Sequence, residues 1–286
     1  MSVCNVCFRK CDIKEGDRGF CGVRICADDR VVPTGYGRVT SLALDPIEKK
    51  PLNRFMPGSR ILSVGSYGCN LRCPFCQNSE ISWSEQAYRY ETEAEILTPE
   101  ELADIAVSAK TKGNIGLAYT YNEPLTDYEF VCDTGRLIHE AGMVNVLVTN
   151  GCASLEILRE LTPVIDAMNI DLKGFTREYY TDVLKGDLDM VLEFIKEAVK
   201  VCHVELTTLI VPGYNDSEEE IRNIAEFIAG LKDKDGNKTG VNIPLHISRF
   251  FPQYMMTDRP PTDVDHIYHL KETASEKLRY VYTGNC

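Results

Sequence analysis

Three cysteines lie within eight residues of the stretch CNLRCPFC, at Cys69, Cys73 and Cys76. Thiolates are preferred ligands of soft metal centres such as iron–sulfur clusters and zinc. Three thiolates are one fewer than the four that close a tetrahedral structural site. The spacing therefore leaves three explanations: a [4Fe–4S] cluster with one open iron, a zinc site completed from elsewhere, and an electron-transfer cluster with a distant fourth cysteine.

The elements that must position this triplet follow a regular order from residue 61 onward. Apolar stretches that predict strands are 61–68, 115–121, 144–150, 164–172, 203–211 and 242–250. Amphipathic helices are predicted between them, for example over 98–110, where Thr98, Pro99 and Glu101 form a capping-box pattern. Strand–helix alternation predicts a parallel sheet with helical crossovers, here an α/β fold with an incomplete (β/α)6 TIM-like barrel.

The triplet comes directly after the first predicted strand. In barrels of parallel strands, chemistry collects at the carboxyl ends of the strands. This position favours the [4Fe–4S] cluster with an open iron over the other two explanations. Residues 260–277 predict a further helix and 279–283 a further short strand.

At this point the sequence resembles the radical S-adenosylmethionine (SAM) superfamily, whose signature is the Cys-x3-Cys-x2-Cys loop with an aromatic residue, here Phe75, before the last cysteine. It is most similar to the branch of pyruvate formate-lyase activating enzyme and, within it, to the enzymes of the AmmeMemoRadiSam system. The matching stretches are 4–24, 37–82, 119–130, 148–151, 169–174 and 207–216.

The resemblance implies that Cys69, Cys73 and Cys76 hold a [4Fe–4S] cluster, and that SAM chelates the open iron. One electron from the cluster then cleaves the sulfonium bond, giving methionine and a 5′-deoxyadenosyl radical that abstracts a hydrogen atom. The missing fourth ligand is thus the cosubstrate. Phe75 is expected beside the cofactors, and the implied fold is the radical SAM partial barrel.

The same resemblance implies further cosubstrate contacts. Activating enzymes carry Gly-Gly-Glu-Pro after the second strand, where this chain has residues 121–124, Tyr-Asn-Glu-Pro. Glu123 is therefore expected to bind the amino group of SAM, with Asn122 beside it. Asn150 is expected at the carboxylate or ribose, and His246 at the ribose. Taken alone, the Asn-Glu-Pro stretch (122–124) and the Asn-Gly pair (150–151) also fit simple turns. A lone histidine such as His246 also fits a structural role.

Asp171 and Lys173 end the fourth predicted strand, and strand alternation places both on one face. Charged side chains are rare inside a barrel unless they are paired or functional. Asp171 and Lys173 fit a structural ion pair. The resemblance instead implies a catalytic role at the cosubstrate and substrate end of the cavity. The charged run DPIEKKPL (45–52) matches the subfamily closely, but its composition is that of a solvated face.

Residues 1–60 lie outside the alternation and predict a small cysteine-rich module, which leaves 61–286 for the barrel. Four thiols within 18 residues predict a second metal site: Cys4, Cys7, Cys11 and Cys21. Four thiolates fill a tetrahedral shell, so no position remains there for SAM. Structural zinc and an auxiliary [4Fe–4S] cluster both fit this spacing, and Cys26 is a further thiol that can replace Cys21.

Composition narrows the class of protein. The 286-residue chain has a net charge of −12, which disfavours nucleic acid as a partner. It shows no secretory signal and no apolar run of about 20 residues, so no membrane partner is expected. Twelve cysteines without a signal indicate metal ligation in a cytoplasmic protein rather than disulfides.

These observations predict reductive SAM cleavage and hydrogen abstraction, driven by an electron donor such as flavodoxin or ferredoxin. The substrate stays open between a glycyl radical site on a partner protein and another modification, linked to Memo-like or AMMECR-like proteins. A non-catalytic zinc or ferredoxin-like binding module is the alternative from another class. Relatives of the subfamily continue past residues 282–285 with further cysteines, so a short or truncated form is also expected.

Overall fold

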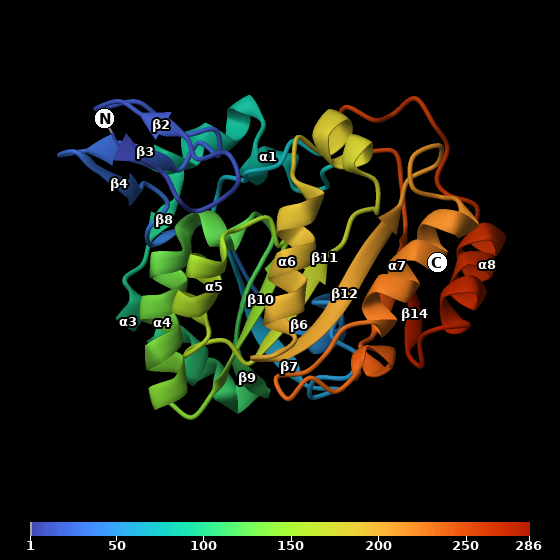
Figure 1. The fold of residues 1–286 in the computed structure, drawn as a ribbon. Coiled ribbons are helices and arrows are strands. Elements are labelled where there is room, and N and C mark those ends of the chain that lie inside the picture. Colours follow the sequence, from blue (N-terminus) through green and yellow to red (C-terminus); the bar gives the residue numbers. More distant parts are fainter. Residues whose placement is uncertain (1) are drawn as a thin grey trace.

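The structure is a computed structural model and describes residues 2–286. Within these residues, eight strands form one curved sheet in the order β14-β13-β12-β11-β10-β9-β7-β6 (Figure 1). Neighbours from β7 to β14 are parallel, and β6 is antiparallel to β7. The strands are β6 (Ser41–Pro46), β7 (Arg60–Gly65), β9 (Asn114–Tyr119), β10 (Val144–Thr149), β11 (Ala167–Asp171), β12 (His203–Ile210), β13 (Leu245–Arg249) and β14 (Val281–Gly284).

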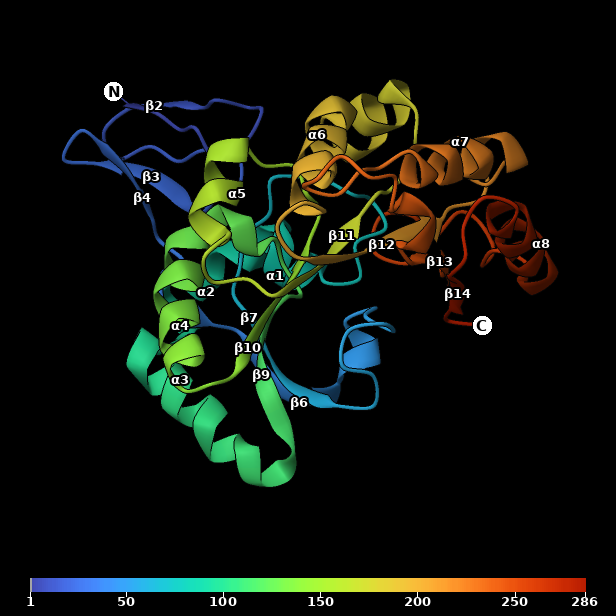
Figure 2. The same cartoon turned by 60° about the horizontal axis from the view of Figure 1, so that its bottom comes forward.

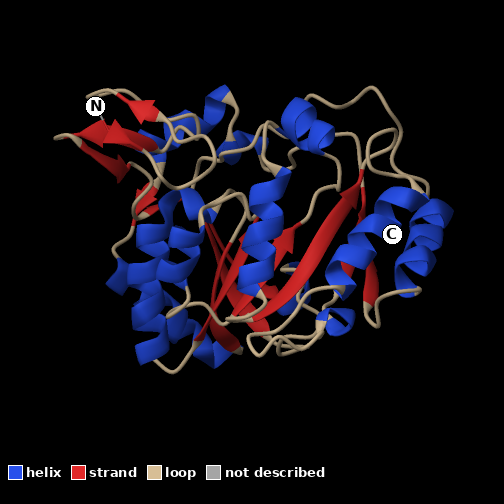
Figure 3. Ribbon diagram, in the orientation of Figure 1, coloured by secondary structure: helices blue, strands red, loops and turns tan. Residues whose placement is uncertain are grey.

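Helices cover the outer face of this sheet and leave its concave face inside (Figure 3). The longer ones are α3 (Pro99–Ser108), α4 (Tyr128–Glu140), α5 (Leu155–Leu161), α6 (Leu188–Ala198), α7 (Glu218–Ala229) and α8 (Val264–Ser275). The capping box of α3 is present, since Thr98 and Glu101 exchange hydrogen bonds. Among residues 2–286, no helix is long and apolar enough to cross a membrane.

The predicted incomplete barrel is confirmed. The further short strand predicted over 279–283 is present as β14, which pairs in parallel with β13 and is the seventh parallel strand of the sheet. The sheet does not close, because β6 and β14 each have one neighbour in it. The carboxyl ends of the parallel strands meet at one rim, where the loops that follow them gather.

Residues 47–59, which we name the floor segment, connect β6 to β7 and lie on the concave side of the sheet (Figure 2). They begin with η1 (Ile47–Lys49). Ile47 and Leu52 are fully buried and pack in a cluster with Ile61, Ala118, Val146 and Ala167. The run 45–52 is therefore only partly a solvated face: Ile47, Lys50 and Leu52 are buried, whereas Glu48 and Lys49 are exposed. The run closes the barrel interior, because its apolar residues have the strands' inner faces to pack against.

The cysteine-rich N-terminal part forms small hairpins at the carboxyl rim of the barrel (Figure 1). β1 (Ser2–Val3) pairs with β2 (Asp12–Ile13), and β3 (Arg24–Ala27) with β4 (Arg30–Pro33). β5 (Arg38–Val39) pairs with β8 (Glu95–Ile96). Because β6 precedes residue 60 yet belongs to the large sheet, the division into 1–60 and 61–286 stays a proposal.

The remaining short helices are α1 (Ser79–Ser82), η2 (Glu85–Arg89), α2 (Tyr90–Glu93), η3 (Ala109–Lys112), η4 (Pro124–Asp127), η5 (Tyr179–Leu184) and η6 (Gly240–Asn242).

Candidate active site

The cysteine triplet occupies the loop that leaves β7 at the carboxyl rim. Cys73 is buried, and Cys69 and Cys76 are half-buried. The Cys76 N–H donates to the Cys73 carbonyl at 3.2 Å, and Arg72 Nη1 donates to the Cys69 carbonyl at 2.8 Å. Burial raises the pKa of Cys73 to about 12, and the neighbouring Cys76 adds to the rise. The free thiols hold their protons, so a bound metal centre would have to displace them.

The donor set fits an iron–sulfur cluster by its chemistry. The three soft thiols of the loop are neighbours, since in addition to burial Cys73 and Cys76 both raise the pKa of Cys69 and Cys76 raises that of Cys73. Within residues 2–286, no group of three or more His, Cys, Asp or Glu side chains is arranged to hold a single metal ion. Each cysteine of a [4Fe–4S] cluster binds a different iron, so its sulfurs do not have to converge on one ion.

Two asparagines support the triplet, Asn70 within the triplet loop and Asn150 directly after β10. Asn150, at the end of β10, donates through Nδ2 to Asn70 Oδ1 at 2.9 Å and lies 3.8 Å from the Cys69 sulfur. Asn70 in turn donates to the Cys152 carbonyl at 2.8 Å. The structure thus places Asn150 against the triplet, while its contact with the SAM carboxylate or ribose stays a prediction. Asn70 was missed, because nothing in the local pattern marks it.

Glu123 lies at the start of the loop after β9 and is almost fully buried. Its carboxylate accepts hydrogen bonds from Thr149 Oγ1 and from the main-chain N–H of Asn150, both at 2.7 Å, and from that of Leu125 at 3.1 Å. Burial raises the pKa of Glu123 to about 7, although these hydrogen bonds act to lower it. A carboxylate has about four acceptor positions. One therefore remains for the predicted amino group of SAM.

Asn122 ties the loop after β9 to the loop after β7. Its Oδ1 accepts from the Ser66 N–H at 3.1 Å, and its Nδ2 donates to the carbonyls of Tyr67 and Gly68 at 3.0 and 3.2 Å. These bonds hold the backbone just before Cys69. Asn122 thus positions the start of the triplet loop, and direct contact with SAM stays a prediction.

Tyr121 stands where the pattern of activating enzymes has the first of two glycines. Its φ is 74°, in the left-handed region that glycine adopts freely. For another residue this conformation costs roughly 1–2 kcal/mol. The Tyr121 hydroxyl donates to Asp45 at 3.1 Å, which helps to hold the residue in place. The turn thus keeps a left-handed residue without glycine.

Asp171 and Lys173 form an ion pair beside the triplet. Lys173 Nζ lies 2.7 Å from Asp171 Oδ2, and the side chains are 18% and 30% exposed. Burial acts to lower the pKa of Lys173, but the charges of Asp171 and Cys73 raise it overall. The pair thus lies within electrostatic reach of a triplet cysteine, on the inner face that alternation predicts.

We expect the substitution Asp171→Asn to slow SAM cleavage about tenfold or more while the iron content stays unchanged. The amide keeps the size of the carboxylate but weakens the charge-assisted bond to Lys173, and 1.4 kcal/mol corresponds to a factor of ten. The measurements are 5′-deoxyadenosine release and iron per chain. Asp189→Asn is the control, since Asp189 pairs with Arg177 at an exposed position. Loss of iron in Asp171→Asn would indicate a folding role instead.

His246 lies in a different network, near the floor segment. Its Nε2 is 2.7 Å from Glu205 Oε2, and its ring stacks on Tyr282 with centroids 5.3 Å apart. Glu205 also accepts from the main-chain N–H groups of Asn53 and Arg54, at 2.9 and 2.7 Å. The predicted ribose contact of His246 stays untested. Glu205 was missed, although a lone carboxylate in the apolar stretch 203–211 is a signal.

Phe75 lies within the triplet loop and its side chain is buried. Its ring packs edge-to-face on Phe250, with centroids 6.4 Å apart. The loop after β13 also reaches the triplet, because the Met255 N–H donates to the Pro74 carbonyl at 2.9 Å. Phe75 thus links the first and last parts of the rim.

The N-terminal cysteines lie next to the triplet loop. Burial raises the pKa of Cys7 to about 11, and the charges of Cys4 and Cys21 add to this rise, which shows that the three thiols are neighbours. The Cys7 thiol also interacts with the Asn70 side chain. Cys26 lies apart from this set, with its sulfur 3.5 Å from a Glu15 carboxylate oxygen.

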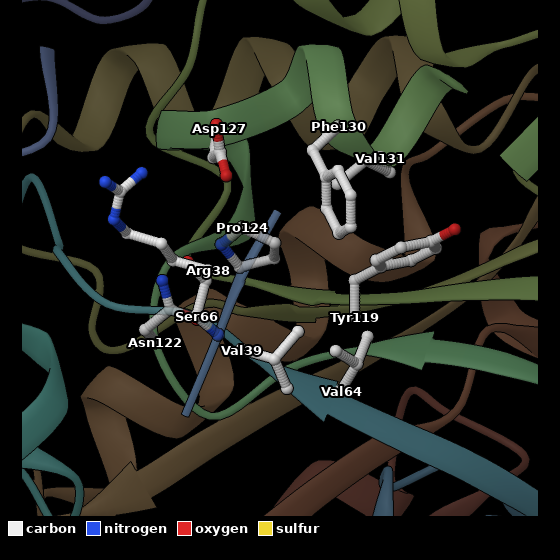
Figure 4. Close-up of a pocket in the computed structure, with 10 residues that line it drawn as sticks. All are labelled: Arg38, Val39, Val64, Ser66, Tyr119, Asn122, Pro124, Asp127, Phe130 and Val131. Atoms are coloured by element: carbon white, nitrogen blue, oxygen red, sulfur yellow. The ribbon is translucent and has the colours of Figure 1, made fainter. Parts of the chain in front are cut away.

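An enclosed pocket near the rim is too small for SAM (Figure 4). It has a volume of about 20 Å³, room for one water, and lies between β7, β9 and α4. Asp127 lines it, and within residues 2–286 its buried carboxylate oxygens have no hydrogen-bond partner. Burial raises the pKa of Asp127 well above its usual value. None of the three triplet cysteines lines this pocket.

A model of the radical SAM superfamily matches residues 63–228. The chain belongs to the radical SAM superfamily. An uncharacterized protein of Methanocaldococcus jannaschii is 44% identical over 99% of this chain and 80% of that protein. The 4-hydroxyphenylacetate decarboxylase activating enzyme of Clostridioides difficile is 24% identical over 74% of the chain and 70% of that enzyme. Pyruvate formate-lyase 1-activating enzyme of Escherichia coli is 26% identical, over 60% and 69%.

Among solved structures, Streptococcus suis SuiB bound to S-adenosylmethionine resembles this radical SAM protein in fold. The TM-score is 0.58 at 14% identity, over 77% of this chain and 48% of that one. The superfamily implies a [4Fe–4S] cluster and SAM as cofactors. The thiols of the triplet, at the rim where the strands end, fit such a cluster as ligands.

Proposed function

We propose that this protein cleaves SAM reductively at a [4Fe–4S] cluster held by Cys69, Cys73 and Cys76, and uses the radical produced to abstract hydrogen from a substrate. The observation that carries this is the meeting of three thiols with the Asp171–Lys173 pair at one rim of the barrel. When bound, the cluster supplies the electron that breaks the sulfonium bond of SAM to give methionine and a 5′-deoxyadenosyl radical.

The chain's own residues would bind and orient SAM. Glu123 has one free acceptor position for the amino group, and Asn150 stands between Glu123 and Cys69. Lys173 is a half-buried cation, so it can attract a carboxylate, while Asp171 partly neutralises its charge. With these roles, the polar groups of the chain would bind the amino and carboxylate groups of SAM beside the triplet.

The proposal is tested by anaerobic reconstitution of the full chain with iron and sulfide. We expect about four irons per chain from this cluster and release of 5′-deoxyadenosine from SAM when a reductant is added. Omission of the reductant is the control, because cleavage needs one electron. A reconstituted protein that binds iron but releases no 5′-deoxyadenosine would contradict the proposal and favour a binding module.

We leave the substrate open between two classes. Relatives at 24% and 26% identity are named as activating enzymes, which supports a protein substrate and a flavodoxin- or ferredoxin-type reductant. Memo-like and AMMECR-like partners stay predictions from the sequence resemblance. Mass spectrometry of candidate partner proteins after turnover separates a glycyl radical site from other modifications.

We also propose a second metal centre at Cys4, Cys7, Cys11 and Cys21, either an iron–sulfur cluster or a zinc ion, for which the four sulfurs would have to move together because they do not converge on one ion among the described residues. The neighbouring thiols and the contact of Cys7 with Asn70 support this proposal. Such a centre has no open position, so it would stabilise the N-terminal hairpins or relay electrons to the triplet.

We expect the double substitution Cys7→Ser/Cys11→Ser to remove one metal centre and leave the triplet cluster in place. Loss of zinc would identify a structural site, because zinc supplies folding energy without redox chemistry. Loss of about four irons with slow SAM cleavage retained would identify an auxiliary cluster. The measurements are metal content and thermal stability. Equal metal content and stability in both proteins would show that these cysteines form no site.

A further inference from the structure

Two arginines lie together against the backbone of the triplet loop. Arg72 belongs to this loop, and its Nη1 donates to the Cys69 carbonyl at 2.8 Å. Arg9, from the N-terminal part, donates through Nε to the Asn70 carbonyl at 3.3 Å. The guanidinium carbons of Arg9 and Arg72 lie 3.2 and 3.8 Å from the ring centroid of Phe20. The triplet loop therefore holds two cations that share one aromatic ring.

No carboxylate compensates the charge of these two arginines. Among residues 2–286, both guanidinium groups donate to main-chain carbonyls and neither forms an ion pair. Burial lowers the pKa of Arg9, and the nearby charge of Arg72 adds to this fall. Lys185 adds a third cation beside them, since its carbonyl accepts from Arg9 and its side chain is exposed. Because like charges disfavour one another, an anionic partner would bind here favourably.

Exposed aromatic and apolar side chains continue this surface toward the loop after β13. The rings of Trp83 and Tyr254 pack edge-to-face with centroids 5.0 Å apart, and the Arg72 guanidinium carbon lies 5.5 Å from the Trp83 ring. Phe20, Tyr254 and Met255 are 36%, 37% and 66% exposed. Arginine, methionine and aromatic side chains are enriched where proteins bind one another. We name six of these residues the rim patch: Arg9, Phe20, Arg72, Lys185, Tyr254 and Met255.

The rim patch touches the triplet loop at two places. Arg9 binds the Asn70 carbonyl, and the Met255 N–H donates to the Pro74 carbonyl at 2.9 Å. Asp171 lies near the same loop but on the inner face of β11, where the substrate end of the cavity is predicted. A substrate of the radical has to enter that interior, whereas an electron donor only has to approach the ligands of the cluster. The rim patch therefore suits an electron donor.

We propose that the rim patch is the docking surface of the electron donor, and that this donor is an acidic protein that carries one electron. This inference rests on the proposed function. The donor is oxidised by one electron and the bound cluster is reduced by one, and no bond forms or breaks. In a chain with a net charge of −12, a local group of cations gives an acidic partner a place to dock. Electron-transfer partners bury little surface, so a patch of this kind is sufficient.

The test uses the reconstituted full chain with an acidic flavodoxin as the probe, and calorimetry measures binding. We expect the wild type to bind flavodoxin and to lose most of this affinity when salt rises from about 0.05 to about 0.5 M, because salt screens surface charges. Lys185→Glu should weaken binding about tenfold or more, since it sets like charges against each other. Arg9→Gln should weaken binding severalfold. Lys112→Glu is the matched control, because Lys112 is exposed just before β9, at the opposite end of the strands.

Two reductants separate docking from an effect on the cluster. Lys185→Glu should slow 5′-deoxyadenosine release when reduced flavodoxin supplies the electron, and should leave it unchanged with dithionite, a small reductant that needs no docking surface. The proposal is overturned if flavodoxin does not bind the wild type, if Lys185→Glu and Arg9→Gln both bind it as the wild type does, or if Lys185→Glu slows both reactions equally. Failure of the proposed function is seen separately, as absence of 5′-deoxyadenosine release from the wild type with dithionite, whereas flavodoxin binding is measured without turnover.

Discussion

Replacing Cys73 with alanine is expected to reduce SAM cleavage to background and to remove most of the iron held at the triplet. Cys73 is the buried cysteine of the three. A cluster that keeps two protein ligands loses the thiolate that ties it to the middle of the loop, and the remaining thiols regain their protons. The measurements are iron per chain, the cluster's absorption and 5′-deoxyadenosine release in anaerobically reconstituted protein.

Cys286→Ala is the matched control for this substitution. Cys286 is exposed, and its sulfur contacts only the Gly284 carbonyl, at 3.6 Å, among the described residues. It should retain wild-type iron and cleavage. Cleavage that survives in purified, reconstituted Cys73→Ala would rule out the triplet as the cluster site, whatever happens to the iron content.

The largest effect on stability is expected from Glu205→Gln, about 3 kcal/mol at pH 7. Burial alone raises the pKa of Glu205, but hydrogen bonds from His203 and His246 and from the floor segment lower it to about 2. The difference from the usual 4.5 corresponds to about 3 kcal/mol of favourable interaction with the charged form. An amide would also turn a donor toward the donating N–H groups of Asn53 and Arg54. Urea denaturation followed by circular dichroism measures the loss.

The pH dependence gives a second readout of the same carboxylate. Its pKa is lower in the folded state than in the unfolded state, so its contribution is complete above pH 4.5 and is lost as the pH falls toward 2. The Gln variant should lack this part of the acid dependence. Glu219→Gln, at an exposed position of α7, should change stability by less than about 0.5 kcal/mol. Equal unfolding free energies for Glu205→Gln and wild type would contradict the role of Glu205 as an anchor of the floor segment.

The features that depend on local spacing could be predicted from the amino-acid sequence alone. The triplet is recognisable because its ligands lie on one loop, and the barrel because strands and helices alternate with short connections. Asp171 and Lys173 could be assigned to one face, since side chains two apart in a strand point the same way. The start of α3 followed from its capping residues.

The residues that fill the barrel interior could be identified only from the folded structure. The run 45–52 has the composition of a solvated loop, yet Ile47 and Leu52 within it are fully buried, because they pack on apolar side chains of strands that are distant in the sequence. Lys50 meets Tyr121, and Glu205 meets Asn53, across long stretches of chain. Glu123, too, turns out to be largely satisfied by Thr149 and Asn150. Such partners are set by the order and curvature of the strands, and the period of a local pattern carries no information about them.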